Sequence, residues 1–584
     1  MIRREFLVRA LSAAAASLLA REALAQQGAH MMQGMSGMSG MQGMQTTSGM
    51  PDMPGGGMAP SVELAAPEAL PSGAPLAPLR LLANESGEPG LFRATLVAQP
   101  VRHTLIAGRP TTFWQYDSAD ERAGDGAGSD PVSAQQQSPV AGPLIDVREG
   151  DMVEIRFVNR LSQPSTIHWH GLPVPADQDG NPSDPVAPGG SRIYRFTLPR
   201  GSAGTYWYHP HPHGQSAEQV FRGLAGPFVV RAADDPLAGW PERHLFFSDL
   251  KLASDGTIPP NDKMDWMNGR EGQFVLVNGA RRPLIVLATD ERWRVWNACN
   301  ARYLRLSLGE DHVFTQVGTD GGLLEQPRTG LTTLLLAPGE RAELMISAVR
   351  TSAQAAQPAQ STPLAKSPQA PRAVLSAEVY DRRKMAMSHG SLPPDRALPL
   401  ADVQFEPAAA DATQTMRSLP ASLRTIEPLG TPVARKSVVF SEHMDMAAMH
   451  QVNGAGNGSA ARRQGERPAS LPTGMAFMIN GATFDPRRIT LTSRRGEVEH
   501  WSIENRTDMD HPFHLHGTQF QVLAREQGGV VAPEPYRAWR DTVNVQPGET
   551  VRIAVVQELA GKRMFHCHIL EHEDLGMMGT LNVI

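Results

Sequence analysis

The sequence predicts an all-β protein of three consecutive β-sandwich domains, at about residues 80–235, 240–400 and 425–584. Short runs in which apolar and polar residues partly alternate recur along the chain, whereas the 3.6-residue periodicity of helices is scarce. Glycine and proline are abundant, at 54 and 48 residues, which favours a turn-rich β protein. The length of 584 residues suits about three to four domains of ordinary size.

Each predicted domain contains runs typical of strands, bounded by turn residues. They lie at 144–159, 192–198 and 226–231 in the first domain, 273–288, 293–308 and 332–349 in the second, and 488–503 and 550–557 in the third. Stretches rich in Ala, Gln, Ser, Gly and Pro are expected to be surface insertions, at 120–142, 351–373 and 451–472.

The first 25 residues are typical of an export signal. Arg3 and Arg4 form a twin-arginine signature, followed by the apolar run 10–20 and a small-residue site that ends at Ala25. The run is too short to span a membrane stably, so we expect cleavage near Ala25 and a periplasmic protein.

Residues 26–79 are predicted to be a disordered, Met-rich tail and linker. Nine methionines lie between residues 31 and 58 among Gly, Gln and Ser, and the frequent glycines oppose a helix. The segment is either a simple tether or a collector of Cu(I), since soft sulfur ligands prefer that ion.

Bulk charge and cysteine content restrict the possible partners. The net charge of -6, without a basic patch, argues against nucleic acid as a partner, and we expect a monomer.

Only two cysteines, Cys299 and Cys567, are present, so disulfides are not expected. Cys299 lies in an apolar stretch and is predicted to be a buried, inert thiol.

The C-terminal segment carries a mixed set of sulfur and nitrogen ligands. Cys567, His572 and Met577 are five residues apart and match a blue-copper electron-transfer centre. Because neighbouring residues of a strand point to opposite faces, His566 and His568 must face away from Cys567. The tripeptide therefore joins a copper on one face to metal on the other.

Three more histidine clusters complete the pattern. With the C-terminal pair they give four i, i+2 pairs, each projecting two imidazoles from one face of a strand: 168/170, 209/211, 514/516 and 566/568. Eight imidazoles would hold about three ions. His511 has the opposite parity to His514 and is predicted to join Cys567, His572 and Met577. His213 is expected to lie outside the metal ligands.

These clusters resemble the four copper signatures of the multicopper oxidases, and residues 80–584 follow the three-cupredoxin plan of that family. The resemblance implies four copper ions: one type 1, one type 2 and two type 3. It implies type 1 ligands His511, Cys567, His572 and Met577, type 2 ligands His168 and His514, and type 3 ligands His170, His209, His211, His516, His566 and His568.

Within the family, the sequence is most similar to bacterial periplasmic cuprous oxidases of copper-efflux systems. That likeness implies that Asp179 and Glu573 relay protons to the oxygen site. The long Met-rich insertion of that group is absent from the third domain, and Thr507 stands where the group has an acidic residue. A Cu(I) docking site remains possible at Met444, Asp445, Met446 and Met509, although methionines at this spacing are equally typical of a core.

The resemblance implies one-electron oxidation of a donor, through the exposed edge of His572 or His511, coupled to reduction of O₂ to water. The donor is expected to be Cu(I), in copper tolerance. The alternative is a laccase acting on phenols or arylamines. A second alternative is a non-catalytic periplasmic protein that sequesters copper.

Overall fold

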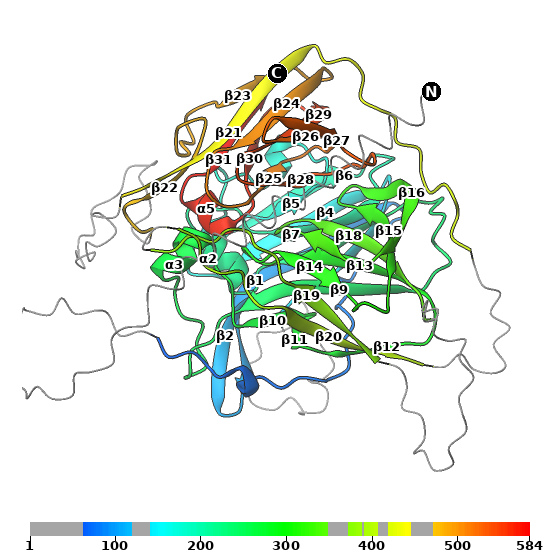
Figure 1. Ribbon diagram of the computed structural model, residues 1–584, viewed down its shortest axis with the longest axis vertical. Coiled ribbons are helices and arrows are strands. Elements are labelled where there is room, and N and C mark those ends of the chain that lie inside the picture. Colours follow the sequence, from blue (N-terminus) through cyan, green and yellow to red (C-terminus); the bar gives the residue numbers. More distant parts are fainter. Residues whose placement is uncertain (1–61, 119–139, 349–371, 388–389, 407–417, 446–470) are drawn as a thin grey trace, which may run out of the picture. The chain divides into compact units, whose positions relative to one another are not determined.

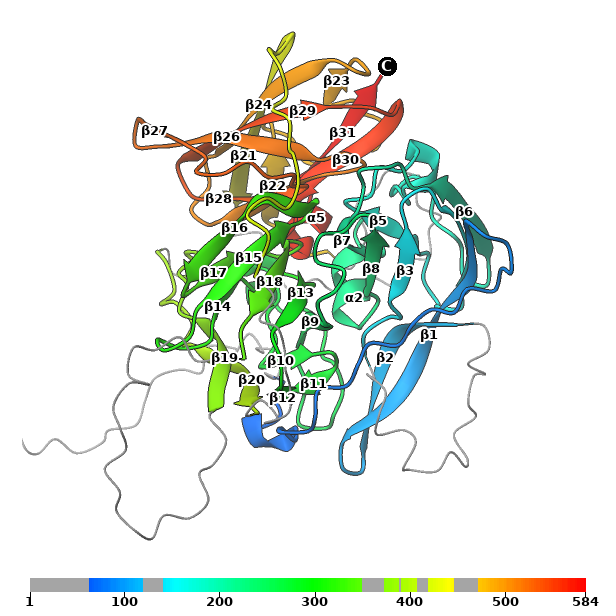
Figure 2. The same ribbon diagram turned by 90° about the vertical axis from the view of Figure 1, so that its right-hand side faces the viewer.

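The computed structural model describes residues 62–118, 140–348, 372–387, 390–406, 418–445 and 471–584. The predicted signal and most of the Met-rich tail lie outside these residues. No helix in the described part of the chain is long and apolar enough to cross a bilayer. The strands form three pairs of sheets, which Figure 2 separates by colour into blue to cyan, green, and orange to red. The all-β prediction is confirmed, whereas the exact domain boundaries stay a prediction.

The first pair of sheets lies within residues 91–231. One sheet has the order β2-β1-β4-β6, and the other has the order β3-β8-β7-β5. The strands are β1 (Leu91–Ile106), β2 (Arg109–Ser118), β3 (Ile145–Arg148), β4 (Met152–Asn159), β5 (His168–His170), β6 (Ser191–Thr197), β7 (Gly204–His209) and β8 (Gly226–Arg231).

The second pair lies within residues 242–405. Its sheets have the orders β11-β10-β9-β13-β18-β15-β16 and β12-β20-β19-β14-β17. The strands are β9 (Glu242–Leu250), β10 (Phe274–Val277), β11 (Ala280–Arg281), β12 (Leu284–Leu287), β13 (Glu291–Asn297), β14 (Leu304–Ser307), β15 (Phe314–Thr319), β16 (Gly322–Leu331), β17 (Leu334–Leu336), β18 (Arg341–Ile346), β19 (Arg372–Glu378) and β20 (Leu398–Phe405).

The third pair lies within residues 434–583. Its sheets have the orders β22-β21-β24-β29-β26-β27 and β23-β31-β30-β25-β28. The strands are β21 (Ala434–Met444), β22 (Met475–Ile479), β23 (Leu491–Ser493), β24 (Val498–Asn505), β25 (His511–Leu515), β26 (Phe520–Gln527), β27 (Val530–Pro533), β28 (Thr542–Val545), β29 (Glu549–Val556), β30 (Gly561–Cys567) and β31 (Met578–Val583).

Each pair of sheets encloses a hydrophobic core, because alternate side chains of the strands face inward. In β24, buried residues alternate with partly exposed ones along the whole strand. Val438 and Phe440 of β21 pack in one cluster with Phe513 and Phe565 of the opposite sheet. Burial of these apolar side chains stabilises the sandwich by about 25 cal/mol per Å² removed from water.

Helical segments are few and short. They are η1 (Pro67–Ala69), η3 (Ala176–Gln178), α2 (Ser216–Phe221), α3 (Lys263–Asn268) and α5 (Leu570–Asp574). Figure 1 shows α5, in red, beside α2 and α3, and the contacts between these helices agree. Three helices that are far apart in the sequence, α2, α3 and α5, therefore lie together at the C-terminal motif.

Candidate metal centres

Cys567, His511 and His572 form the first group of candidate ligands. Cys567 ends β30 and His511 begins β25, its neighbour in the same sheet, while His572 lies on α5. His511 Nδ1 lies 3.3 Å from Cys567 Sγ and 3.3 Å from His572 Nδ1. All three side chains are fully buried. The predicted parity of His511 is therefore confirmed, and the three donors converge on one point.

Burial sets the protonation of this group. It lowers the pKa of His511 to about 3, so the imidazole is neutral and its nitrogen lone pair is free to bind a metal. It also raises the pKa of the Cys567 thiol well above its usual value. Ile569 N–H donates to Cys567 Sγ at 3.3 Å and favours the thiolate. A soft cation would complete the stabilisation of that thiolate.

Met577 is held next to this group by the backbone. Cys567 N–H donates to Met577 O at 3.0 Å, and Met577 N–H donates to His572 O at 2.9 Å. The turn before it needs glycine, because Gly576 has φ 115° and a Cβ there would lie 2.7 Å from Thr483 Cβ. Met577 itself is fully buried in the core that contains Cys567.

The eight histidines of the i, i+2 pairs are all fully buried and gather at one place: His168, His170, His209, His211, His514, His516, His566 and His568. The strand register brings the pairs together. His168 lies opposite His209 between β5 and β7, and His514 lies opposite His566 between β25 and β30. Two sheets from the two ends of the chain thus supply one cluster.

Several Nε2 atoms of these histidines point toward one another. His566 Nε2 lies 3.1 Å from the Nε2 atoms of both His211 and His516. His168 Nε2 lies 3.4 Å from His514 Nε2. Burial lowers the pKa of His566 to about 3, so this imidazole is neutral. The lone pairs of unprotonated Nε2 atoms that face one another can be satisfied by a metal ion bound between them, so this arrangement fits metal ions.

His170, His209 and His568 form the remaining group. Their ring centroids lie 5.7 Å apart for His170 and His209, 4.9 Å for His170 and His568, and 5.6 Å for His209 and His568. Among the described residues, neither nitrogen of His568 nor Nε2 of His209 has a hydrogen-bond partner. Buried nitrogens without partners are costly unless a ligand binds them, so this group also fits a metal ion.

Asp179 and Glu573 lie against the cluster and are fully buried. Asp179 Oδ1 and Oδ2 lie 3.1 and 3.2 Å from the Nδ1 atoms of His168 and His516. Glu573 Oε2 lies 3.3 Å from His566 Nδ1. Both carboxylates therefore contact the ring nitrogen that faces away from the cluster, which fixes ring orientation.

Asp541 was missed by the sequence analysis. It is fully buried, and its Oδ1 lies 2.9 Å from His170 Nε2, while its backbone oxygen lies 2.9 Å from His514 Nδ1. Arg341, from the second pair of sheets, binds both Asp541 oxygens, at 2.7 and 2.5 Å. Neither residue belongs to a motif, so no sequence signal separates them from ordinary charged residues.

The expectation of an exposed edge on His572 or His511 is wrong, because both rings are fully buried. His572 Nε2 donates to Met267 O at 3.1 Å, and Phe477 stacks on the same ring with centroids 3.9 Å apart. Met267 lies on α3, whose start is fixed by a capping box between Asp262 and Asp265. The short helix α3, which lies between strands of the second pair of sheets, thus covers the ring of His572.

Methionines are frequent in the hydrophobic core that contains Cys567. Besides Met577, six belong to this core or pack against it: Met264, Met267, Met385, Met387, Met444 and Met475. The segment with Met385 is tied to α3, because Asn268 Nδ2 donates to Met385 O at 3.1 Å and Met385 N–H donates to Asn268 Oδ1 at 2.6 Å. Thioether side chains are therefore available as soft ligands in the same core as the buried group.

The predicted docking residues differ in exposure. Met446 lies outside the described residues. Met444 is partly buried, Asp445 is exposed, and Met509 is fully buried. Met509 and Asp445 therefore do not face solvent together.

Two other sequence predictions concern Cys299 and His213. Cys299 is buried, and burial raises the pKa of its thiol, as expected of an inert cysteine. His213 stands apart from the eight clustered histidines, with its ring edge against Phe484.

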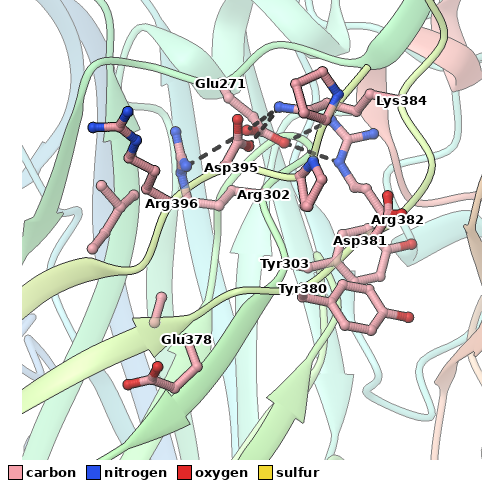
Figure 3. A pocket seen from close by; sticks show the side chains of 14 residues that line it. Glu271, Arg302, Tyr303, Glu378, Tyr380, Asp381, Arg382, Lys384, Asp395 and Arg396 are labelled. Atoms are coloured by element: carbon pink, nitrogen blue, oxygen red, sulfur yellow. Dashed lines mark hydrogen bonds and ion pairs between the residues drawn. The ribbon is translucent and has the colours of Figure 1, made fainter. Parts of the chain in front are cut away.

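A small hollow opens beside Asp510, the residue before His511. Tyr303 and Tyr380 line it with stacked rings, centroids 5.4 Å apart, and Tyr380 Oη donates to Asp510 Oδ2 at 2.5 Å. Figure 3 shows the charged residues of its wall, among them Glu271, Arg302, Arg382, Lys384 and Asp395. Its free volume of about 30 Å³ has room for about two waters, not for an organic donor.

Comparison with known proteins relates the chain to one protein family. Two family models, both described as multicopper oxidase, match residues 130–235 and 457–584. The multicopper oxidase mco of Staphylococcus aureus is 30% identical over 452 residues, covering 76% of this chain and 82% of the relative. The laccase of Bacillus subtilis is 26% identical, covering 76% and 88%. The cell division protein FtsP of Photorhabdus laumondii is 26% identical, covering 76% and 83%.

Solved structures give the same result. A multicopper oxidase from Campylobacter jejuni, described as a metallo-oxidase, is 40% identical with a TM-score of 0.75, covering 90% of this chain and 98% of that one. The McoA multicopper oxidase of Aquifex aeolicus is 26% identical with a TM-score of 0.67, covering 88% and 100%. The buried Cys–His and histidine groups accordingly fit copper. The chain belongs to the multicopper oxidase family.

Proposed function

We propose that this protein couples one-electron oxidation of a donor to the four-electron reduction of O₂ to water. The observation that carries the proposal is the joining of two buried ligand groups by one tripeptide. Cys567 belongs to the first group, while His566 and His568, its covalent neighbours, belong to the histidine cluster. A protein that only stores copper does not need a covalent connection between two groups of metal ligands.

The proposal assigns four copper ions to the described groups. The type 1 ligands are His511, Cys567, His572 and Met577. The type 2 ligands are His168 and His514. The type 3 ligands are His170, His209 and His568 for one ion, and His211, His516 and His566 for the other. Short distances support the sets of His511, Cys567 and His572, of His168 and His514, and of His211, His516 and His566. For His170, His209 and His568 the support is ring centroids 4.9 to 5.7 Å apart.

Copper supplies one-electron redox chemistry at the first group and oxygen reduction at the second. The chain supplies orientation, exclusion of water and proton donors. Asp179 and Glu573 contact the ring nitrogens of the cluster, so their carboxyl groups are placed to hold the protons that water formation consumes. Both are shielded from bulk solvent.

Cu(I) is the donor we favour, in a periplasmic copper-tolerance role after twin-arginine export. The support is the sealing of His572 by Met267 O and Phe477, which leaves an organic ring no contact with that imidazole. The surrounding thioethers suit a soft monovalent ion. The alternative donor is a phenol or arylamine, as the laccase relative suggests.

Steady-state rates with Cu(I) and with a bulky phenol test this choice. Full-length protein is compared with variants that lack residues 26–60 or 441–450. Loss of Cu(I) oxidation alone in either deletion supports a cuprous oxidase. Fast phenol oxidation that neither added copper nor either deletion changes would favour the laccase.

A second candidate is a non-catalytic role, suggested by the FtsP relatives. It includes the sequestration of copper by the Met-rich tail. Oxygen consumption during turnover with Cu(I) or a phenol separates the two, because a scaffold or storage protein consumes none.

A further inference from the structure

Arg563 is a fully buried cation that the proposed reaction does not use. It lies on β30, three residues before His566. Its Nη2 donates to Val174 O at 3.0 Å, but Nε and Nη1 have no hydrogen-bond partner within the described ranges. Burying an ion without enough polar partners is strongly unfavourable, so a guanidinium in this place needs a compensating charge.

Asp179 provides that charge. Its Oδ2 lies 3.9 Å from Arg563 Nη1, and no other carboxylate of the described chain lies within 4.0 Å of the guanidinium. The same carboxylate contacts His168 through Oδ1 and His516 through Oδ2. Arg563 and His516 therefore both face Oδ2 of Asp179, while His168 faces Oδ1.

The backbone makes room for this approach. Gly517, directly after His516, has φ 63°, and a Cβ there would overlap Arg563 Nη1. Glycine is thus required both by the backbone conformation and by the guanidinium. The space beside His516 is filled by the charge of Arg563 instead of by an apolar side chain.

We propose that Arg563 is a positioning residue that holds the Asp179 carboxylate between His168 and His516. With the carboxylate fixed, the Nδ1 atom of each ring is engaged and Nε2 is turned toward the cluster, where His514 and His566 face it. Among the described residues Arg563 has no hydrogen bond or ion pair with a candidate ligand, so it would act through Asp179. The inference rests on the proposed copper assignment.

The test uses full-length protein and four variants at two positions: Arg563→Met, Arg563→Lys, Asp179→Asn and Arg563→Met/Asp179→Asn. Arg552→Met, on β29 and partly exposed beside Glu526, is the control for loss of one arginine. Copper affinity of the metal-free protein is measured by competition with a chelator. The electron paramagnetic resonance spectrum of the type 2 copper and the blue absorption are recorded on copper-loaded protein.

Arg563→Met is expected to weaken copper binding at the cluster by about 10-fold or more and to alter the type 2 spectrum, while the blue absorption stays. Arg563→Lys keeps the charge and should recover most of the affinity. In the Asp179→Asn background, Arg563→Met should add less than about 2-fold, because both changes remove one interaction.

Unchanged affinity and spectrum in Arg563→Met would overturn the inference, and so would an equal further loss in the Asp179→Asn background. If Arg563→Met does not fold, Arg563→Gln takes its place in both backgrounds. A wild-type protein that binds no copper would contradict the proposed function instead, since the role of Arg563 is read only from differences between variants.

Discussion

Replacement of Arg341 by methionine is expected to lower the free energy of unfolding strongly, and by more than the other substitutions of charged residues described above. Its fully buried side chain joins all three pairs of sheets. Nε donates to Thr205 O at 2.8 Å, and the two Nη atoms bind both oxygens of Asp541. Its backbone N–H donates to Asp320 Oδ1 at 2.8 Å.

The magnitude follows from what the substitution leaves behind. Asp541 is fully buried and would lose its ion pair with Arg341, although Thr542 Oγ1 would still donate to its Oδ1. Breaking a buried ion pair by removing one member costs about 3–5 kcal/mol, because the remaining charge is uncompensated. Removing the charge at Asp541 as well should recover much of this loss.

Urea unfolding of the metal-free protein measures the effect in Arg341→Met, Asp541→Asn and the double variant. The expected loss in free energy of unfolding is about 3–5 kcal/mol for Arg341→Met, with a smaller loss in the double variant. Arg552→Met, at a partly exposed ion pair, should change stability by less than about 1 kcal/mol. A loss below about 1 kcal/mol in Arg341→Met, or a double variant as unstable as the sum of both, would refute the reasoning.

Three further predictions concern the surroundings of the Cys567 group. Burial raises the pKa of Glu442 to about 7, so its ionisation destabilises the folded state progressively between about pH 4.5 and 7. Glu442→Gln should therefore raise the melting temperature at pH 8 and leave it nearly unchanged at pH 4; equal effects at both pH values would contradict this. Phe477→Ala removes a fully buried ring stacked on His572 and should lower the free energy of unfolding by about 3–5 kcal/mol in urea, whereas a loss below about 1 kcal/mol would not fit. Met577→Leu should keep the blue absorption but raise the reduction potential of that copper, because a weak axial thioether is lost; an unchanged potential would exclude Met577 as the axial ligand.

Much of the fold and of the site could be predicted because the signals are local. The alternation in β24 and the i, i+2 spacing of His566 and His568 both follow from the two-residue period of a strand. The same period placed His511 beside Cys567, and the structure confirms it. Neither inference needs knowledge of how the domains pack.

The errors concern contacts between distant segments. The burial of His572 depends on α3, a six-residue helix about 300 residues earlier in the chain, too short to show helical periodicity. Arg341 and Asp541 are 200 residues apart, and single charged residues carry no sign of a buried partner. Tertiary packing, which local patterns do not encode, decides these positions.

The copper content and blue absorption of wild-type protein and Cys567→Ser, measured with oxygen consumption on the same samples, test the central claim most directly. Serine is similar in shape but lacks the thiolate that would give the blue absorption and connect the copper to the tripeptide with His566 and His568. We predict about four copper ions and a blue colour in the wild type, and neither blue colour nor oxygen consumption in Cys567→Ser. A variant that remains blue and still consumes oxygen would contradict the account.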